Sequence, residues 1–296
     1  MQINSRRHGL LFALAVFTPI GPTLAQTLSG AIDIHAHCDP DGTPRSIDAI
    51  DLARLAKNRG MRAIVLKNHY EPTASLAYLV RKEVPGIEVF GGISLDLTNG
   101  GVNPAAVEWM TKVKGGYGRV VWMPTFDSEH NAAPEHRPFA RVATDGRLVP
   151  EVVQVIGIIA KHNLVLETGH SSPAEALLLI REGKRQGVQN IVVTHAISRL
   201  VGMSISEMQE AAKLGAYLEF VYVKPGSEEA QAHVKAIRAV GPEHCILSSD
   251  LGQATNPLHP DGLLALYQYL MQQGFTEAEI DLMAKVNPSR VLGLTP

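Results

Sequence analysis

The chain has 296 residues, of which 45% are hydrophobic and 19% are charged, and its net charge is −2 at neutral pH. A chain of this length accommodates one large α/β barrel or two smaller domains. The balanced charge and an aromatic content of 5% argue against the basic, aromatic-rich surfaces that bind nucleic acid, so we expect no nucleic-acid partner.

The N-terminus has the pattern of a secretory signal peptide. Residues 5–8 supply positive charge, and residues 9–25 form an apolar run. Thr23–Ala25 places small residues where a signal peptidase cuts, which predicts cleavage before Gln26.

Two prolines interrupt this run and leave it shorter than the ~20 residues that a membrane span needs. We therefore expect a signal peptide over residues 1–25, a single domain over residues 26–296 and no stable membrane anchor after cleavage. Arg6 and Arg7 resemble a twin-arginine signal. The mature protein is expected to be periplasmic or secreted.

Eight short apolar runs follow, separated by helical patterns. The runs span residues 31–37, 61–66, 87–93, 119–123, 164–166, 191–194, 216–221 and 246–249. Helices are expected from a cap at Ser46 to Gly60, over 73–83, from Asn103–Pro104 to Gly115, over 150–162, from a capping box at Ser172, and over 263–273.

This alternation of strands and helices predicts a parallel (β/α)8 TIM barrel. The runs are nearly continuous in Val, Ile and Leu, which is typical of strands buried on both faces. A doubly wound sheet is the alternative, but no Gly-x-Gly-x-x-Gly turn follows the first run.

The connection after residues 119–123 is long. It contains Asp127, His130, His136 and Arg137, followed by an apparent hairpin around residues 144–147. Long connections are more often functional lids than packing elements. The loop is expected either to contact the substrate or to add only polar surface.

The first apolar run ends in two histidines, His35 and His37. Side chains alternate along a strand, so both imidazoles are expected on one face. Two imidazoles at the end of a buried strand make half of a metal site, although a lone His-x-His pair is a weak signal.

Other metal-binding residue types follow the ends of further strands. Active sites of such barrels lie at the C-terminal ends of the strands, where these side chains would meet. They are Lys67 and His69 after the second run, His170 after the fifth, His195 after the sixth and Asp250 after the eighth. The clustering of histidines at strand ends predicts a metal site.

Glu167 and His170 compete for the ligand position after the fifth run. Aligning residues 163–170 with residues 190–195 places Thr168 level with His195. Alternation from Thr168 then favours His170 and turns Glu167 away, unless a bulge reverses the face.

Lys67 and Asp250 allow several roles. Lys67 would contact an anionic substrate oxygen, bridge two metals after carboxylation, or form an ion pair. Asp250 ends an apolar strand, where a buried carboxylate needs a metal or a hydrogen-bonding partner, and the alternative is a helix cap.

The ordered motifs resemble the amidohydrolase superfamily of metal-dependent hydrolases. They are the histidine pair 35 and 37, Lys67–Tyr70, Thr168–His170, Val193–His195, Asp250 and the closing segment Asn287–Leu294. The resemblance implies that His35, His37 and Asp250 bind one divalent metal, while His170 and His195 complete it or bind a second. The bridging residue usual after the fourth strand is absent from Val121–Thr125, so one or two ions are expected, zinc first, with manganese, iron or cobalt as alternatives.

The resemblance also implies hydrolysis of an amide, lactone, ester or phosphoester bond in a small molecule by metal-activated water. Asp250 would be the general base, and His69 or Lys67 would stabilise the developing oxyanion. The alternatives are a metal-dependent decarboxylase or lyase on the same barrel, and a periplasmic metal- or solute-binding protein. The sequence leaves no mark of the oligomeric state.

Overall fold

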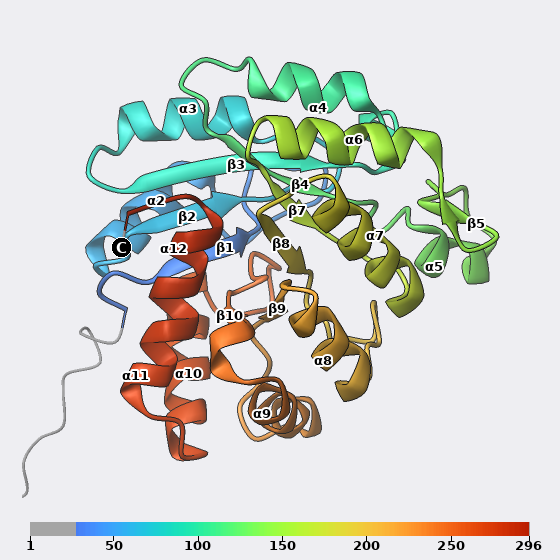
Figure 1. Ribbon diagram of the computed structural model, residues 1–296. Coiled ribbons are helices and arrows are strands. Elements are labelled where there is room, and N and C mark those ends of the chain that lie inside the picture. The colour runs from blue at the N-terminus through green and yellow to red at the C-terminus, as the bar shows by residue number, and fades with distance from the viewer. Residues whose placement is uncertain (1–27, 296) are drawn as a thin grey trace, which may run out of the picture.

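The computed structural model describes residues 28–295, so the predicted signal peptide lies outside the described residues. Eight parallel strands form one sheet in the order β1-β2-β3-β4-β7-β8-β9-β10 (Figure 1). They are Ile32–Ala36 (β1), Ala63–Leu66 (β2), Glu88–Ser94 (β3), Gly118–Trp122 (β4), Val165–Glu167 (β7), Asn190–Val193 (β8), Tyr217–Phe220 (β9) and Cys245–Leu247 (β10).

The sheet closes between its first and last strands. The backbone N–H of Asp250 donates to the carbonyl of His35 at 2.8 Å, and that of His37 donates to the carbonyl of Leu251 at 2.9 Å. These bonds lie just beyond the end of β10, at the C-terminal ends of the strands. The predicted TIM barrel is confirmed.

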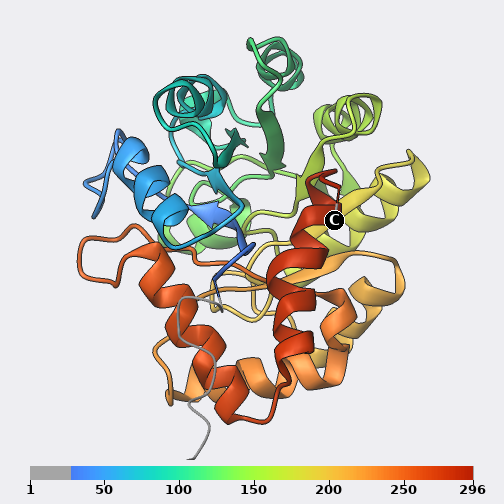
Figure 2. The same cartoon turned by 90° about the vertical axis from the view of Figure 1, so that its left-hand side faces the viewer.

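Helices surround the strands, as Figure 2 shows. The α-helices are Ala49–Asn58 (α2), Ala74–Glu83 (α3), Pro104–Thr111 (α4), Glu129–Ala132 (α5), Pro150–Lys161 (α6), Pro173–Arg185 (α7), Ile205–Lys213 (α8), Glu228–Val240 (α9), His259–Gln272 (α10), Glu277–Asp281 (α11) and Asn287–Val291 (α12). Short 3₁₀ helices cover Leu97–Asn99, Ala133–Glu135 and Pro242–His244, and a π-helical turn covers Leu282–Val286. Within residues 28–295, no helix is both long and apolar enough to cross a membrane.

Two apolar layers hold the barrel together. One lies between the strands and the surrounding helices. The other fills the barrel interior and includes Ile32, Phe90 and Ile246 from three different strands. Val291 and Leu292 from α12 and its end belong to the same interior cluster, so this helix covers one end of the barrel.

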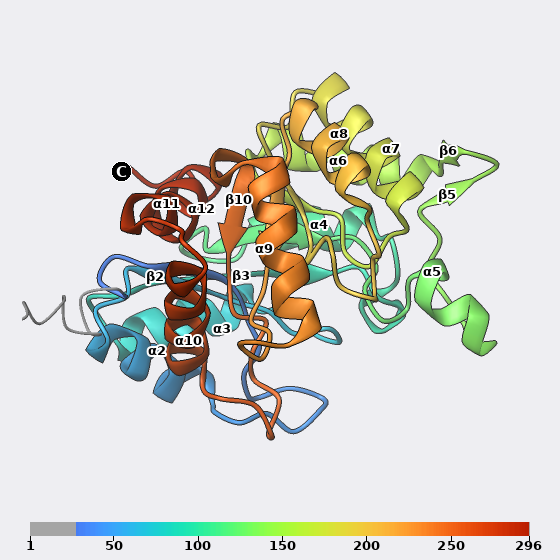
Figure 3. The ribbon, with the colours of Figure 1, turned by 90° about the horizontal axis from the view of Figure 1, so that it is seen from below.

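Most predicted helix starts are confirmed. Asn103 caps α4 by accepting the N–H groups of Ala105 and Ala106, and Ser172 forms a capping box with Glu175. The predicted hairpin is also present, as Ala143–Thr144 (β5) pairs with Arg147–Leu148 (β6). This hairpin and α5 project from one side of the molecule (Figure 3).

Two helix starts differ from the prediction. Asp48, not Ser46, caps α2, because its carboxylate accepts the N–H groups of Ile50 and Asp51 and its charge suits the helix N-terminus. The last large helix, α10, begins at His259 rather than Leu263. Pro260 occupies the first turn of this helix, where proline is tolerated.

Candidate metal centre

A register irregularity in β1 turns His35 into the barrel. Ile32 and Ile34 pack in the interior cluster, so strict alternation would send His35 outward. Between Asp33 and Ala36, however, the pairing of β1 with β2 shifts. The carboxylate of Asp33 accepts the N–H of His35 at 3.1 Å and that of Ser249 at 2.9 Å, which holds the irregular backbone. Irregularities of this kind commonly re-aim side chains beside active sites.

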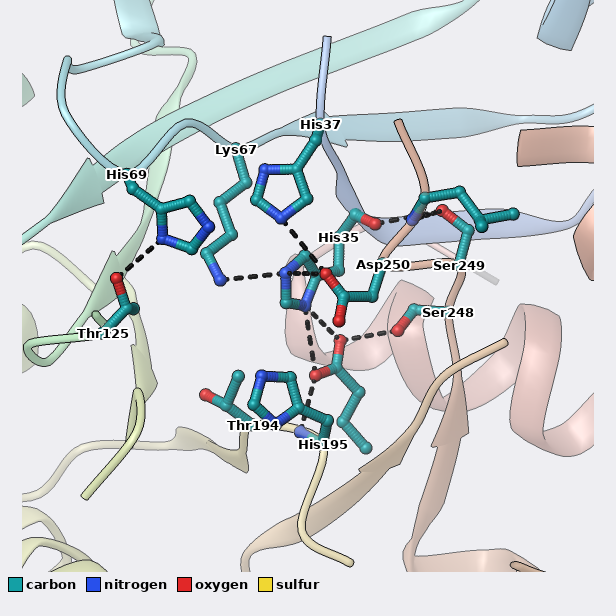
Figure 4. A network of polar contacts seen from close by, with 12 residues as sticks. His35, His37, Lys67, His69, Thr125, Thr194, His195, Ser248, Ser249 and Asp250 are labelled. Carbon is teal, nitrogen blue, oxygen red and sulfur yellow. Dashed lines mark hydrogen bonds and ion pairs between the residues drawn. The ribbon is translucent and has the colours of Figure 1, made fainter. Parts of the chain in front are cut away.

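His35, His37 and Asp250 converge at the C-terminal end of the strands (Figure 4). The Oδ1 atom of Asp250 lies 3.0 Å from Nε2 of His35 and 3.1 Å from Nε2 of His37. Each residue offers one ligand atom, and these three atoms lie within 4.8 Å of one another. Asp250 adopts a φ of +49°, a strained conformation that is typical of functional positions in non-glycine residues.

Two carboxylates flank His35. Glu219 contacts its Nδ1 at 3.1 Å, and Asp250 contacts its Nε2. Burial alone would lower the pKa of His35, but the Asp250 and Glu219 carboxylates outweigh it and raise the pKa to about 9. These two carboxylates therefore favour positive charge at the position of His35. A divalent ion held by His35, His37 and Asp250 would supply such a charge, so the donor set fits a metal.

His170 and His195 form a second pair beside the first. Their Nε2 atoms lie 3.2 Å apart, and the ring of His195 stacks on that of His35 at 5.9 Å. Gly169 makes the approach of His170 possible, because it has a φ of +61° and a Cβ there would lie 2.2 Å from the carbonyl oxygen of Met123. The histidines predicted to meet therefore do meet, while their role as ligands remains a prediction.

Burial keeps most of these imidazoles neutral. It lowers the pKa of His37 to about 3 and that of His195 to about 4, and it holds the pKa values of His69 and His170 well below their usual range. A neutral imidazole is the form that binds a metal.

Glu167 points into the barrel, contrary to the expectation that it faces away. It lies two residues after Val165, which packs in the interior cluster, and its carboxylate accepts the Thr194 hydroxyl at 2.7 Å. The alignment was two residues out of register, because β7 pairs Glu167 with Val192. Alternation also ends before the histidines, because Gly169 and His195 both have positive φ values. Both side chains therefore lie at the inner face.

Lys67 is fully buried beneath these groups. Its Nζ lies 2.9 Å from Nε2 of His35 and 5.4 Å from the ring centre of Trp122. Burial lowers the pKa of Lys67, although the surrounding carboxylates partly compensate. Burial, followed by the nearby charge of Glu219, raises the pKa of Glu167 to about 8.

Sequence reasoning missed Glu219. Besides His35, its carboxylate accepts the backbone N–H of His195 at 2.9 Å and the Ser248 hydroxyl at 2.5 Å. Glu219 therefore connects β1 with the segments that follow β8 and β10, below the candidate metal ligands. The available signal was a glutamate inside the apolar run Leu218–Phe220, where an unpaired buried carboxylate would be costly.

His69 lies at the edge of this cluster, stacked on His37 at 4.8 Å between ring centres. Phe126, another residue that the sequence did not single out, packs on His69 at 4.4 Å and on His170 at 5.4 Å. Phe126 belongs to the long loop predicted to act as a lid.

A cavity of about 940 Å³ opens beside the metal centre and is lined by His195, Asp250, Arg199, Tyr222 and Lys224 among others. A neighbouring cavity of about 410 Å³ is lined by Tyr70, Phe126, Arg137 and Arg199 among others. His130 of the long loop lines a different pocket. The long loop thus reaches the site through Phe126 and Arg137.

Comparison with known proteins gives a family and a fold. A model described as a family of unknown function, DUF6282, matches residues 30–219. The chain belongs to this family. The match includes both histidine pairs, Lys67 and Glu219, while Asp250 lies beyond it. No curated protein matches the sequence significantly.

Solved structures share the fold at low sequence identity. An amidohydrolase from Pseudomonas aeruginosa has a TM-score of 0.66 and 13% identity, over 90% of this chain and 97% of that chain. A 2,6-dihydroxybenzoate decarboxylase from Rhizobium has a TM-score of 0.57 and 13% identity, over 90% and 99%. A zinc-bound amidohydrolase from Burkholderia multivorans has a TM-score of 0.60 and 12% identity, over 90% and 99%. The likeness to amidohydrolase-superfamily structures is confirmed at the level of fold.

Proposed function

We propose that this protein is a metal-dependent hydrolase that cleaves an amide, lactone, ester or phosphoester bond in a small molecule. The observation that carries the proposal is the convergence of His35, His37 and Asp250 at the C-terminal end of the barrel. Active sites of such barrels lie at this end, and His/His/carboxylate sets bind catalytic zinc. The zinc-bound structural neighbour supports zinc as the first candidate ion.

The residues of the site would have separate roles. His35, His37 and Asp250 would hold the ion, with His170 and His195 adjoining it. When bound, a divalent ion polarises a substrate oxygen and makes water nucleophilic near neutral pH. Asp250 has a quarter of its side chain exposed at the cavity floor, so its carboxylate is placed to accept a proton from water and return it to the leaving group.

Lys67 would act from within the barrel wall. Because its ammonium is buried among carboxylates, it compensates their charge and approaches His35 rather than the open cavity. This placement supports an electrostatic role over direct contact with a bulky substrate. Carboxylation of Lys67, which would let it bridge two ions, adds mass that intact-protein mass spectrometry would detect.

The first test is the metal content of the purified protein and of Asp250→Asn. Asp145→Asn is the matched control, because Asp145 is exposed and has a φ of +50°, close to the +49° of Asp250. We expect Asp250→Asn to lose more than about 100-fold in zinc affinity, since even outer partners of metal ligands contribute about 10–100-fold. Full metal retention by Asp250→Asn would refute the site.

The second test is turnover by the zinc- or manganese-loaded protein in ¹⁸O-labelled water. Amides, lactones, esters and phosphoesters form the panel, and hydrolysis must place the label in the product. Release of carbon dioxide from an aromatic carboxylate without such labelling would instead identify a decarboxylase, the candidate that the Rhizobium structure favours. Tight metal binding with no turnover in either assay would favour a binding protein.

We also propose that the protein is exported and acts as a periplasmic or secreted enzyme on a small-molecule substrate. The charged start and apolar run of residues 1–25 support export. N-terminal sequencing of the protein from the periplasmic fraction tests this, with Gln26 expected as the first residue. An uncleaved N-terminus in the cytoplasm would contradict it.

A further inference from the structure

The ring of His69 is held by a chain of two further residues. Its Nδ1 lies 2.7 Å from the hydroxyl oxygen of Thr125, and that hydroxyl also contacts a carboxylate oxygen of Asp96. His69, Thr125 and Asp96 are all buried and come from three different strand ends. The metal ligands do not use this chain of contacts.

The direction of the hydrogen bonds follows from Asp96. Burial raises the pKa of Asp96, but its Oδ1 accepts the backbone N–H of Thr125 at 2.8 Å and that of Asp127 at 3.0 Å, and these bonds favour the ionised carboxylate. The remaining oxygen, Oδ2, then accepts the proton of the Thr125 hydroxyl. A hydroxyl has only one proton to donate, so its oxygen must accept the Nδ1–H of His69.

A neutral imidazole with its proton on Nδ1 has an unprotonated nitrogen at Nε2, which accepts hydrogen bonds. Figure 4 shows this second ring nitrogen turned toward Lys67 and His37, away from Thr125. No described protein group hydrogen-bonds to it. The group of three metal-binding side chains formed by residues 35, 37 and 250 does not include His69.

We propose that Asp96 and Thr125 fix the tautomer of His69, so that its Nε2 accepts a hydrogen bond from an O–H or N–H group of the bound substrate. The substrate therefore carries such a donor next to the group that reaches the metal. The substrate contact rests on the proposed function, whereas the tautomer of His69 does not. An acceptor at Nε2 also replaces the oxyanion-stabilising role expected from the sequence, which would need a donor there.

The tautomer is read directly by NMR of protein labelled with ¹⁵N-histidine, with and without added zinc. The signal missing from His69→Asn identifies the ring. We expect the proton on Nδ1 in the wild type and in Thr125→Ser, which keeps the hydroxyl. In Asp96→Asn, the new amide donates to Thr125, so the hydroxyl turns to His69 and the proton moves to Nε2.

The outcome of this experiment decides whether Asp96 and Thr125 fix the tautomer of His69. A proton on Nε2 in the wild type, or an unchanged tautomer in Asp96→Asn, would overturn it. If Nε2 is unprotonated and its ¹⁵N signal shifts on zinc addition as that of a coordinated nitrogen does, His69 is a metal ligand. This result would overturn the substrate contact. Circular dichroism of each variant checks that it is folded, and Thr125→Ser supplies a conservative rescue.

The substrate contact is tested with two metal-chelating probes that differ in one donor. Acetohydroxamate has an N–H group, which N-methylacetohydroxamate lacks. Calorimetry on the zinc-loaded protein should show acetohydroxamate binding about fivefold to tenfold more tightly, the scale of one hydrogen bond. We expect His69→Phe and Asp96→Asn to abolish this preference.

Equal affinities of the wild type for the two probes would refute the contact. A preference that persists in His69→Phe would refute it as well. Failure of both probes to bind, together with failure to bind zinc, would contradict the proposed metal-dependent function, and the NMR experiment would still decide the tautomer.

Discussion

The two ends of the barrel interior bury opposite kinds of side chains, although the same strands supply both. Toward the strand starts, the interior is filled by apolar side chains such as Ile32, Phe90 and Ile246, packed against α12. Toward the strand ends, it holds five histidines, a lysine and several carboxylates, nearly all buried. The first arrangement gains stability from burial, whereas the second places charges where desolvation opposes folding.

Backbone strain and unpaired polar atoms are found at the polar end of the barrel. His195 and Asp250 have φ values of +24° and +49°, and they lie shortly after the ends of β8 and β10. Buried nitrogens without partners also occur there, on His37 and His170. Strain and unpaired polar atoms are retained at functional sites when the surrounding packing holds them.

The largest effect is expected at the apolar end. Phe90→Ala should lower the free energy of unfolding by about 3–5 kcal/mol, because it removes a large side chain from a packed interior. Zinc affinity should stay within about twofold of the wild type if the two ends act independently. Urea unfolding and metal titration measure the two quantities, with the exposed Leu79→Ala as control. A large loss of zinc affinity would show that the ends are coupled.

A pH effect of about 3 kcal/mol is expected at the polar end. His259 is buried, its Nε2–H donates to the carbonyl of His37 at 2.9 Å, and burial lowers its pKa to about 4. Between pH 6.5 and 4 the unfolded chain binds a proton at this residue and the native protein does not. The metal-free protein therefore loses up to about 3 kcal/mol from His259 as the pH falls through this window, and no further effect arises above it.

His259→Asn should remove this part of the pH dependence, as measured by urea unfolding of the metal-free protein at pH 4.5 and 7. His136→Asn, at an exposed position, is the control. An identical pH slope in the wild type and in His259→Asn would argue against a neutral His259 in the native state.

A smaller effect is expected at Glu219, which lies beneath His35 at the polar end. Glu219→Gln keeps the size of the side chain but weakens the acceptor for Nδ1 of His35. Zinc affinity should fall about 10–100-fold, the usual cost of losing an outer partner of a ligand. Chelator competition measures this, and Glu243→Gln at an exposed position should leave the affinity unchanged.

Much of the fold could be predicted because it depends on local patterns. Apolar runs, helix caps at Asn103 and Ser172, and the regular alternation of strands and helices all express preferences of neighbouring residues. The errors at Ser46 and Leu263 concern helix boundaries, where a competing cap or a proline in the first turn moves the start by a few residues.

The sequence by itself determined that metal-binding residue types follow the ends of the strands, since His35, His37, His170, His195 and Asp250 are visible in the one-dimensional order. The tertiary structure decided which of them face one another. The shifted register of β1 and the turn at Gly169 set the directions of His35 and His170, and closure of the barrel brought Glu219 beneath His35. Side-chain direction after a bulge or turn depends on contacts between distant segments, which alternation along one strand does not encode.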